Sequence, residues 1–93
     1  MKFKVVVSDQ AGADIDRLER WLLDRQASAA PRVGDAIRTK IADLQTLPNR
    51  GRLLTDGFRE VLARFGRGAY VIRYRVVDRT VCITRIRHSR ENR

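Results

Sequence analysis

The side chains best suited to chemistry lie in the second half of the chain. His88 is the only histidine among the 93 residues, and an imidazole can accept or donate a proton near neutral pH. Several arginines accompany it, and a guanidinium binds phosphate or carboxylate groups through paired, planar hydrogen bonds. The candidates for contacting a partner or a nucleic acid are Arg59, Arg73, Arg75, Arg85, Arg87, His88 and Arg90. These residue types predict an anion-binding surface at which one side chain can also move a proton.

The distribution of charge indicates the same kind of surface. The formal net charge is +9, yet residues 1 to 48 are nearly balanced, with 8 Lys or Arg against 7 Asp or Glu. Residues 49 to 93 hold 12 arginines, no lysine and four acids. Such a field implies an anionic partner, which is a nucleic acid, an acidic protein segment, or both.

The sequence offers no pattern for a metal or a cofactor. Cys82 is the only cysteine, so neither a disulfide within the chain nor a cysteine-based metal site can form. Gly66 and Gly68 flank one arginine, which is too short for a phosphate loop. The apolar stretch 5–7 is too brief for a signal peptide or a membrane span. We therefore expect one domain, 1–93, in the cytoplasm, without cofactor, metal or membrane.

Two amphipathic helices are expected in the first half. A strand over 2–7 is followed by Ser8, a residue type that favours a helix N-cap. Apolar residues at spacings of three and four then predict a helix over 9–26, with Asp14 among its polar positions. Pro31 is well placed at the first position of a second helix, which Leu47 and Pro48 should close.

Three strands are expected after a loop over 48–52. The runs Phe58–Phe65, 70–77 and 81–88 are rich in branched and aromatic residues and are separated by short breaks, so they should be consecutive and antiparallel. In the middle run an apolar set alternates with Arg73 and Arg75, which predicts one apolar face that the helical hairpin covers. The expected fold is α+β, in the order β-α-α-β-β-β, with an antiparallel sheet.

This order and several short motifs resemble the RelE/ParE toxin family over nearly the whole chain. The motifs are Leu44 to Gly51 as Leu-x-x-Leu-Pro-x-x-Gly, Phe58-Arg59-Glu60-Val61, the run from Tyr70 to Val76, and the ending from Ile83 to Arg90. Members of this family are the toxic halves of two-gene, plasmid-stabilisation-like modules. The resemblance implies an antitoxin whose extended, acidic segment wraps the toxin, with Leu18, Trp21 and Leu22 as candidates for its groove. Operator DNA would be contacted only through the antitoxin.

The family contains two kinds of toxin, one that cleaves messenger RNA on the ribosome and a ParE branch that poisons DNA gyrase. RNA cleavage needs groups that move protons and positive charge at the phosphate. In a ribonuclease, His88, Arg59, Arg73 and Arg85 would have these roles.

Departures from the ribonuclease pattern favour the ParE branch. The tail 89–93 lacks the aromatic residue common in RNA-cleaving relatives, and 49–57 offers only Asp56 as a base. Most aromatic side chains are also expected in the core, away from RNA bases. The segment His88-Ser89-Arg90 resembles the His-x-Arg ending of the ParE branch. We therefore predict a gyrase inhibitor without catalytic residues. The alternatives are a ribosome-dependent endoribonuclease and a non-toxic, antitoxin-binding co-regulator of its own operon.

Overall fold

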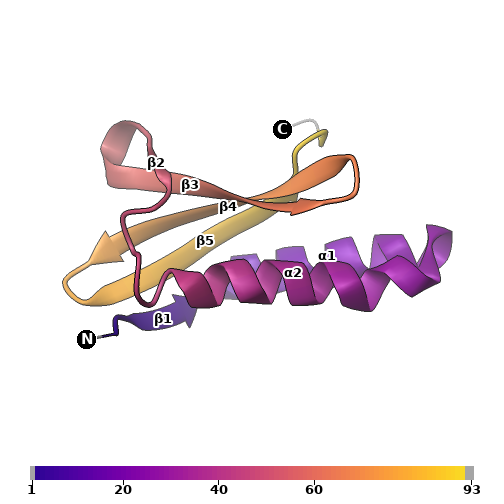
Figure 1. Ribbon diagram of the computed structural model, residues 1–93, viewed down its shortest axis with the longest axis horizontal. Coiled ribbons are helices and arrows are strands. Elements are labelled where there is room, and N and C mark those ends of the chain that lie inside the picture. Colours follow the sequence, from indigo (N-terminus) through magenta and orange to yellow (C-terminus); the bar gives the residue numbers. More distant parts are fainter. Residues whose placement is uncertain (1, 92–93) are drawn as a thin grey trace.

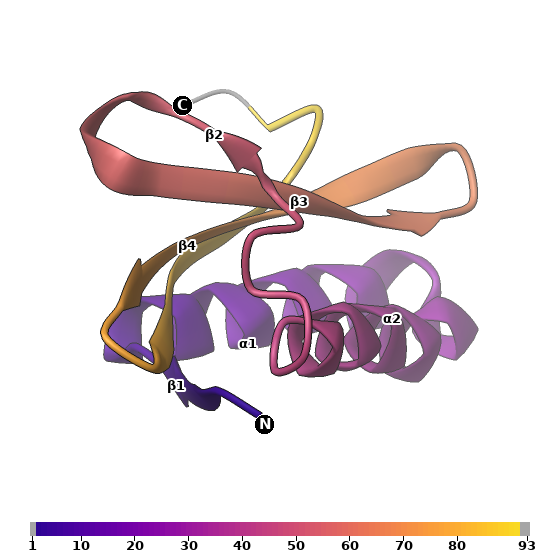
Figure 2. The same ribbon diagram turned by 60° about the vertical axis from the view of Figure 1, so that its left-hand side comes forward.

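Two helices pack on one face of a twisted sheet in the computed structural model, which describes residues 2–91 (Figures 1 and 2). The helices in this part of the chain are α1 (Asp9–Arg25) and α2 (Ala30–Asp43), joined by the short 3-10 helix η1 (Ala27–Ala29). The strands are β1 (Lys4–Val7), β2 (Arg52–Leu53), β3 (Phe58–Phe65), β4 (Gly68–Val77) and β5 (Thr80–His88), and η2 (Thr55–Gly57) precedes β3. No helix among these residues is long and apolar enough to cross a membrane.

The helices begin where the sequence predicts. The Ser8 hydroxyl oxygen accepts a 3.0 Å hydrogen bond from the Ala11 N–H, which caps α1. Pro31 lies in the first turn of α2, where its missing N–H costs no helical hydrogen bond. The expected end of α2 at Leu47 was wrong, because the regular helix stops at Asp43. From Leu44 the N–H groups bond carbonyls three residues back, which tightens the chain into turns.

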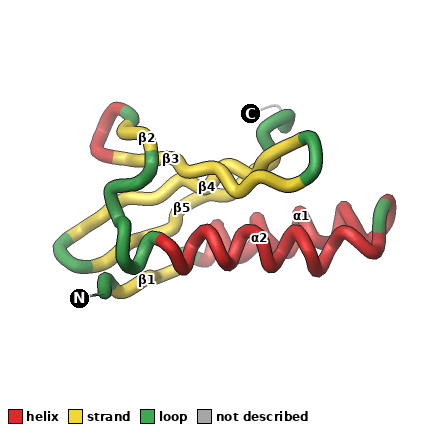
Figure 3. The backbone as a smooth tube through the Cα atoms, viewed as in Figure 1, coloured by secondary structure: helices red, strands yellow, loops and turns green. Residues whose placement is uncertain are grey.

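The sheet has the strand order β1-β5-β4-β3-β2. The three long strands are consecutive and antiparallel, as predicted. Their two-residue turns use Gly66 and Asp78, whose φ values are 60° and 55°. Contrary to the expected all-antiparallel sheet, β1 pairs in parallel with β5, so the sheet is mixed. The sequence reasoning also missed β2, a two-residue strand on β3 inside the connection from α2 (Figure 3).

The core lies between the helical hairpin and the sheet. Along β4, Tyr70, Ile72 and Tyr74 are buried on the helix-facing side, while Arg73 and Arg75 are exposed on the outer face, as their alternation predicts. The buried helix residues that meet this side are Ala11, Leu18, Leu22, Val33, Ile37 and Ile41.

A β-bulge interrupts β5. Arg73 pairs with Arg85, but its neighbour Tyr74 pairs with Ile83, which leaves Thr84 without a partner on β4. Ile83 and Ile86 are both fully buried although three residues apart. A regular strand alternates sides every residue, so the extra residue exchanges the two faces for everything that follows.

Candidate functional site

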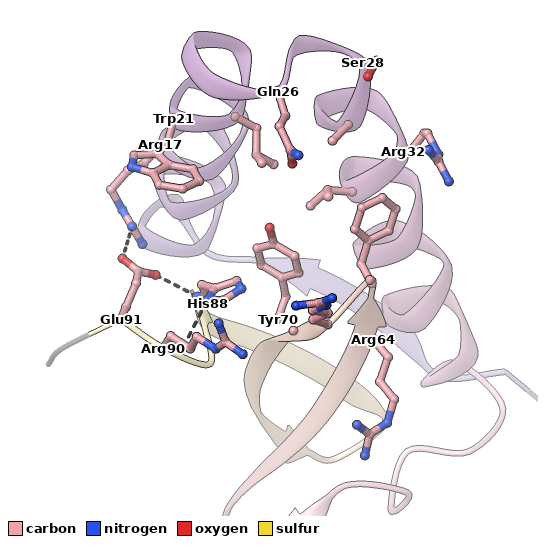
Figure 4. A pocket seen from close by; sticks show the side chains of 17 residues that line it. Arg17, Trp21, Gln26, Ser28, Arg32, Arg64, Tyr70, His88, Arg90 and Glu91 are labelled. Atoms are coloured by element: carbon pink, nitrogen blue, oxygen red, sulfur yellow. Dashed lines mark hydrogen bonds and ion pairs between the residues drawn. The ribbon is translucent and has the colours of Figure 1, made fainter.

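A groove with a volume of 1170 Å³ opens between the far end of the helical hairpin and the turn that joins β3 to β4 (Figure 4). The tail after β5 forms its third wall. Its apolar lining includes Leu22, Ala29, Val33, Phe65 and Tyr70. A surface of this kind can bury apolar side chains of a ligand.

Arginines surround this apolar lining. Those that line the groove are Arg17, Arg32, Arg64, Arg67 and Arg90. Arg17 forms an ion pair with Glu91, the one acid among the lining residues. Arg64, Arg67 and Arg90 make no salt bridge with any residue from 2 to 91. The groove therefore offers guanidinium groups to an anionic ligand.

His88 faces the groove beside Tyr70. The two rings pack edge to face, with centroids 5.1 Å apart and an interplanar angle of 78°. The imidazole Nδ1 accepts a 3.1 Å hydrogen bond from the Arg90 N–H. The imidazole also lies against Gly68, where a Cβ would come within 2.6 Å of its Nε2, so a larger residue at this position would force the imidazole to move. Burial, with the negative charge of Glu91, raises the pKa of Tyr70, whose protonated hydroxyl points into the groove (Figure 4).

Four of the other candidate arginines bind acceptors of the protein itself. Arg59 donates to the Gly51 and Asn49 carbonyls at 2.9 and 3.2 Å. Arg73 pairs with Glu60 at 3.4 Å. Arg75 donates to the Asp56 carbonyl at 2.7 Å and lies 4.4 Å over the Phe58 ring. Arg85 donates to Asp14 at 3.0 Å, and Arg87 is in register with Val71.

The structure does not bring His88, Arg59, Arg73 and Arg85 together. Arg59 is in register with Tyr74, and His88 with Tyr70. Four residues along β4 correspond to about 13 Å at the usual strand rise. Arg73 and Arg75 lie on the outer face of the sheet, whereas Arg59, opposite Tyr74, lies on the helix-facing side. Of the predicted partner-binding residues, His88 and Arg90 line the groove.

Asp14 is the important residue whose place the sequence reasoning misjudged. It was expected among the polar positions of the first helix, yet it is 2% exposed. Its Oδ2 accepts from the Ile86 N–H at 2.8 Å and from Arg85 Nε at 3.0 Å. Burial alone would raise the pKa of Asp14, but the hydrogen bonds from Arg85, Ile86 and Gln10 outweigh it and hold the pKa below its ordinary value. The spacing of three from Ala11 and four to Leu18 placed Asp14 at the border of the apolar stripe.

The three antitoxin-groove candidates occupy different environments. Leu18 and Leu22 are 6% and 5% exposed, and Leu22 also lines the groove. Trp21 is 53% exposed at the groove edge, with the Arg25 guanidinium 4.3 Å over its ring. Of the six aromatic side chains, Tyr70 and Tyr74 belong to the buried core and Phe3 and Phe65 pack against it partly buried, which agrees with the expectation that most of them are core residues. Within 2–91, no group of three His, Cys, Asp or Glu side chains could hold a metal ion.

Comparison with known families identifies the chain. A sequence model of the family described as "ParE toxin of type II toxin-antitoxin system, parDE" matches residues 5–93. The chain belongs to this family. This ParE-family toxin is 42% identical over 93 residues to Toxin RelE1 of Caulobacter vibrioides, with 100% of each chain covered. It is 40% identical to Toxin RelE3 of the same organism, covering 96% of this chain and 97% of that one.

Two solved structures share the fold of this ParE-family toxin. The chromosomal ParDE system of P. aeruginosa matches with a TM-score of 0.76 at 20% identity, over 91% of this chain and 94% of that one. The RelBE2 toxin–antitoxin complex of Mycobacterium tuberculosis matches with a TM-score of 0.71 at 26% identity, over 95% and 99% of the two chains. The RelE/ParE family and fold expected from the sequence are confirmed, and the protein is a toxin of a type II toxin–antitoxin system.

Proposed function

We propose that this toxin acts by binding DNA gyrase, without cutting RNA, and that a cognate antitoxin neutralises it. The observation that supports this most is the separation of His88 from Arg59, Arg73 and Arg85. The gyrase target itself rests on membership of the ParE family.

RNA cleavage requires proton transfer and positive charge at one phosphate, within hydrogen-bond reach of the reacting atoms. Arg59 and His88 are held about 13 Å apart along β4. Nη1 of Arg59 and Nε of Arg85 are also bonded to internal oxygens, which leaves these guanidinium groups fewer donors for a phosphate. A ribonuclease with these four residues in its active site would have to rearrange the sheet, whereas a binding protein needs no such convergence.

The groove suits an antitoxin as its occupant. An extended segment with acidic side chains would meet Arg64, Arg67 and Arg90, and apolar side chains in the same segment would pack on the lining. Trp21 stands half-exposed at the edge of the groove, and tryptophan is enriched among the residues that carry most of the binding energy in protein interfaces. This arrangement also agrees with the antitoxin partners in the names of both similar structures.

The second candidate, a ribonuclease, is favoured by one observation. His88 and Tyr70 are in contact inside a groove that also contains three arginines without ion pairs among the described residues. Such a set offers a proton carrier, an aromatic face for a base and charge for a phosphate. The curated relatives also carry the name RelE.

Replacing His88 separates the two candidates. His88→Gln keeps a polar side chain of similar size but removes proton transfer near neutral pH. We expect the variant, induced without antitoxin, to arrest growth as strongly as the unaltered chain, and coexpressed antitoxin to rescue both. Growth at the uninduced rate, with the variant at the same soluble level as the unaltered chain, would contradict the proposal and support the ribonuclease. Harmlessness of the unaltered chain would instead support the antitoxin-binding co-regulator.

A further inference from the structure

The carboxylate of Asp14 is buried and hydrogen-bonded; it does not line the groove itself, but it contacts Arg85 and the groove-lining Arg17. We propose that Asp14 is a positioning residue: together with Ser8 it holds the β-bulge at Thr84, and the bulge directs His88 into the groove. This inference rests on the proposed role of the groove as a binding surface, and it identifies buried residues that hold one side chain of that surface in place.

The bulge decides which way His88 points. Ile83 faces the core, so in a regular strand 85 and 87 would follow it inward and His88 would lie on the outer face. The unpaired Thr84 shifts this alternation by one residue. Ile86 is therefore buried opposite Ile72, and His88 comes to lie opposite Tyr70 on the helix-facing side.

The bulge lies where β5 loses β1, its neighbour on the side away from β4. β1 ends at Val7, in register with Ile83, so beyond that point the β5 backbone pairs with β4 alone. The start of α1 takes the place of that strand. Ser8 donates its N–H to the Ile83 carbonyl at 3.0 Å and its hydroxyl to the Thr84 carbonyl at 3.2 Å. Asp14 then accepts the Ile86 N–H, two residues further along.

The same turn of α1 holds the tail that follows His88. Arg17, three residues after Asp14, donates to Asp14 and to the Ile86 carbonyl, both at 3.4 Å. It also pairs with Glu91, whose second carboxylate oxygen accepts the His88 N–H at 2.8 Å (Figure 4). These bonds hold the β5 backbone to α1 at Ile86 and, through Glu91, at His88. With the backbone held in this way, the His88 imidazole points toward Gly68 and Tyr70.

A buried carboxylate restricts the geometry of the groups that bond to it. If either the carboxylate or one of its donors is lost, a buried polar group is left unpaired, so the bonded geometry is strongly preferred over nearby alternatives. Thr84 adds a bond of its own, from its hydroxyl to the Arg73 carbonyl at 3.1 Å. The bulge is therefore bonded to β4 on one side and to α1 on the other.

The test compares Asp14→Asn with Asp16→Asn in the full chain. Asp16 is exposed on the same helix, so the control makes the same change of charge without touching these bonds. The readout is nuclear magnetic resonance of the ring protons, recorded well below the unfolding temperature. We expect Asp14→Asn to lose most of the cross-peak intensity between the Tyr70 and His88 rings, by roughly fivefold or more for a shift of about 1–2 Å that an altered bulge causes. Asp16→Asn should retain the unaltered cross-peak.

A second variant covers the case in which Asp14→Asn fails to fold. Ser8→Gly removes the hydroxyl bond to Thr84, and glycine is well tolerated at a helix N-cap. It should weaken the same cross-peak.

The ring contact is measured on the toxin alone, so its result does not depend on what the groove binds. Titration of the unaltered chain with a synthetic peptide of alternating glutamate and leucine tests the proposed occupant separately. Saturable binding of the peptide supports the groove's proposed occupant, and no binding contradicts it. An unchanged ring contact in folded Asp14→Asn or in Ser8→Gly would overturn the positioning role.

Discussion

His88 and Arg59 both face the helices, but their in-register partners on β4, Tyr70 and Tyr74, are four residues apart. The guanidinium of Arg59 is directed to the other end of the sheet, where it binds the Gly51 and Asn49 carbonyls. His88 instead meets the apolar lining of the groove. This separation supports the proposed binding role over RNA cleavage by these residues.

Arg59 should matter for stability and little for toxicity. Arg59→Gln removes charged hydrogen bonds to two carbonyls, one of them partly buried, and should lower the free energy of unfolding by about 1–2 kcal/mol. Urea denaturation measures this change, and growth arrest measures toxicity. Arg52→Gln is the control, since Arg52 is 75% exposed and its pair with Glu60 should contribute about 0–1 kcal/mol. Loss of toxicity in a folded Arg59→Gln chain would speak for catalysis.

Tyr74 should be a main anchor of the loop before β2. Its hydroxyl accepts the Gly51 N–H and donates to the Pro48 carbonyl, each at 2.8 Å. Tyr74→Phe leaves the buried Gly51 N–H unpaired, so we expect a loss of about 1–3 kcal/mol in urea or thermal denaturation. Tyr70→Phe is the matched control, because that hydroxyl points into the groove (Figure 4), and it should change stability by less than about 0.5 kcal/mol. Equal effects of the two substitutions would show that the loop does not depend on Tyr74.

Asp14 should make the fold sensitive to acid. Its pKa is lowered in the folded state, so its contribution to stability is complete above the ordinary Asp value of 3.8 and is lost as the pH falls through the lower folded-state pKa. The unaltered chain should lose stability more steeply than Asp14→Asn in urea titrations between about pH 5 and about pH 2. Parallel curves for the two chains would mean that Asp14 has the same pKa folded and unfolded.

Trp21 should contribute to antitoxin binding more than to folding. It is 53% exposed at the groove, so Trp21→Ala should change the unfolding free energy by less than about 1 kcal/mol. The affinity of the variant for the antitoxin of the same two-gene module should fall by about 30-fold or more, as expected when an aromatic side chain that dominates an interface is removed. Leu23→Ala serves as the control, because Leu23 is 57% exposed on the same helix but outside the groove lining. If both variants bind equally well, the antitoxin uses a different surface.

Local patterns in the sequence predicted most of the fold. The helices follow from apolar spacings of three and four and from Ser8 and Pro31, and the long strands follow from alternation between turn residues. The parallel pairing of β1 with β5 joins segments more than 70 residues apart. Nothing in either segment encodes the other, so only the packed structure reveals that pairing.

The site was less predictable for the same physical reason. The sequence around Thr84 fits a regular strand as well as a bulged one, so the direction of His88 could not be read from it. The burial of Asp14 depends on donors from Arg85 and Ile86, which lie far along the chain. His88 and Arg90, two of the predicted partner-binding residues, line the groove, whereas grouping His88 with Arg59 required a geometry that residue types cannot supply.

The most direct test of the account is to induce the chain without antitoxin and to score gyrase-dependent DNA breakage beside the 5′ ends of cellular RNA in one culture. Breakage should disappear in cells whose gyrase resists the toxin, and His88→Gln should leave it unchanged. The account predicts broken DNA with intact messages. Cleaved messages with intact DNA, abolished by His88→Gln, would contradict it and make the groove around His88 and Tyr70 the active site of a ribonuclease.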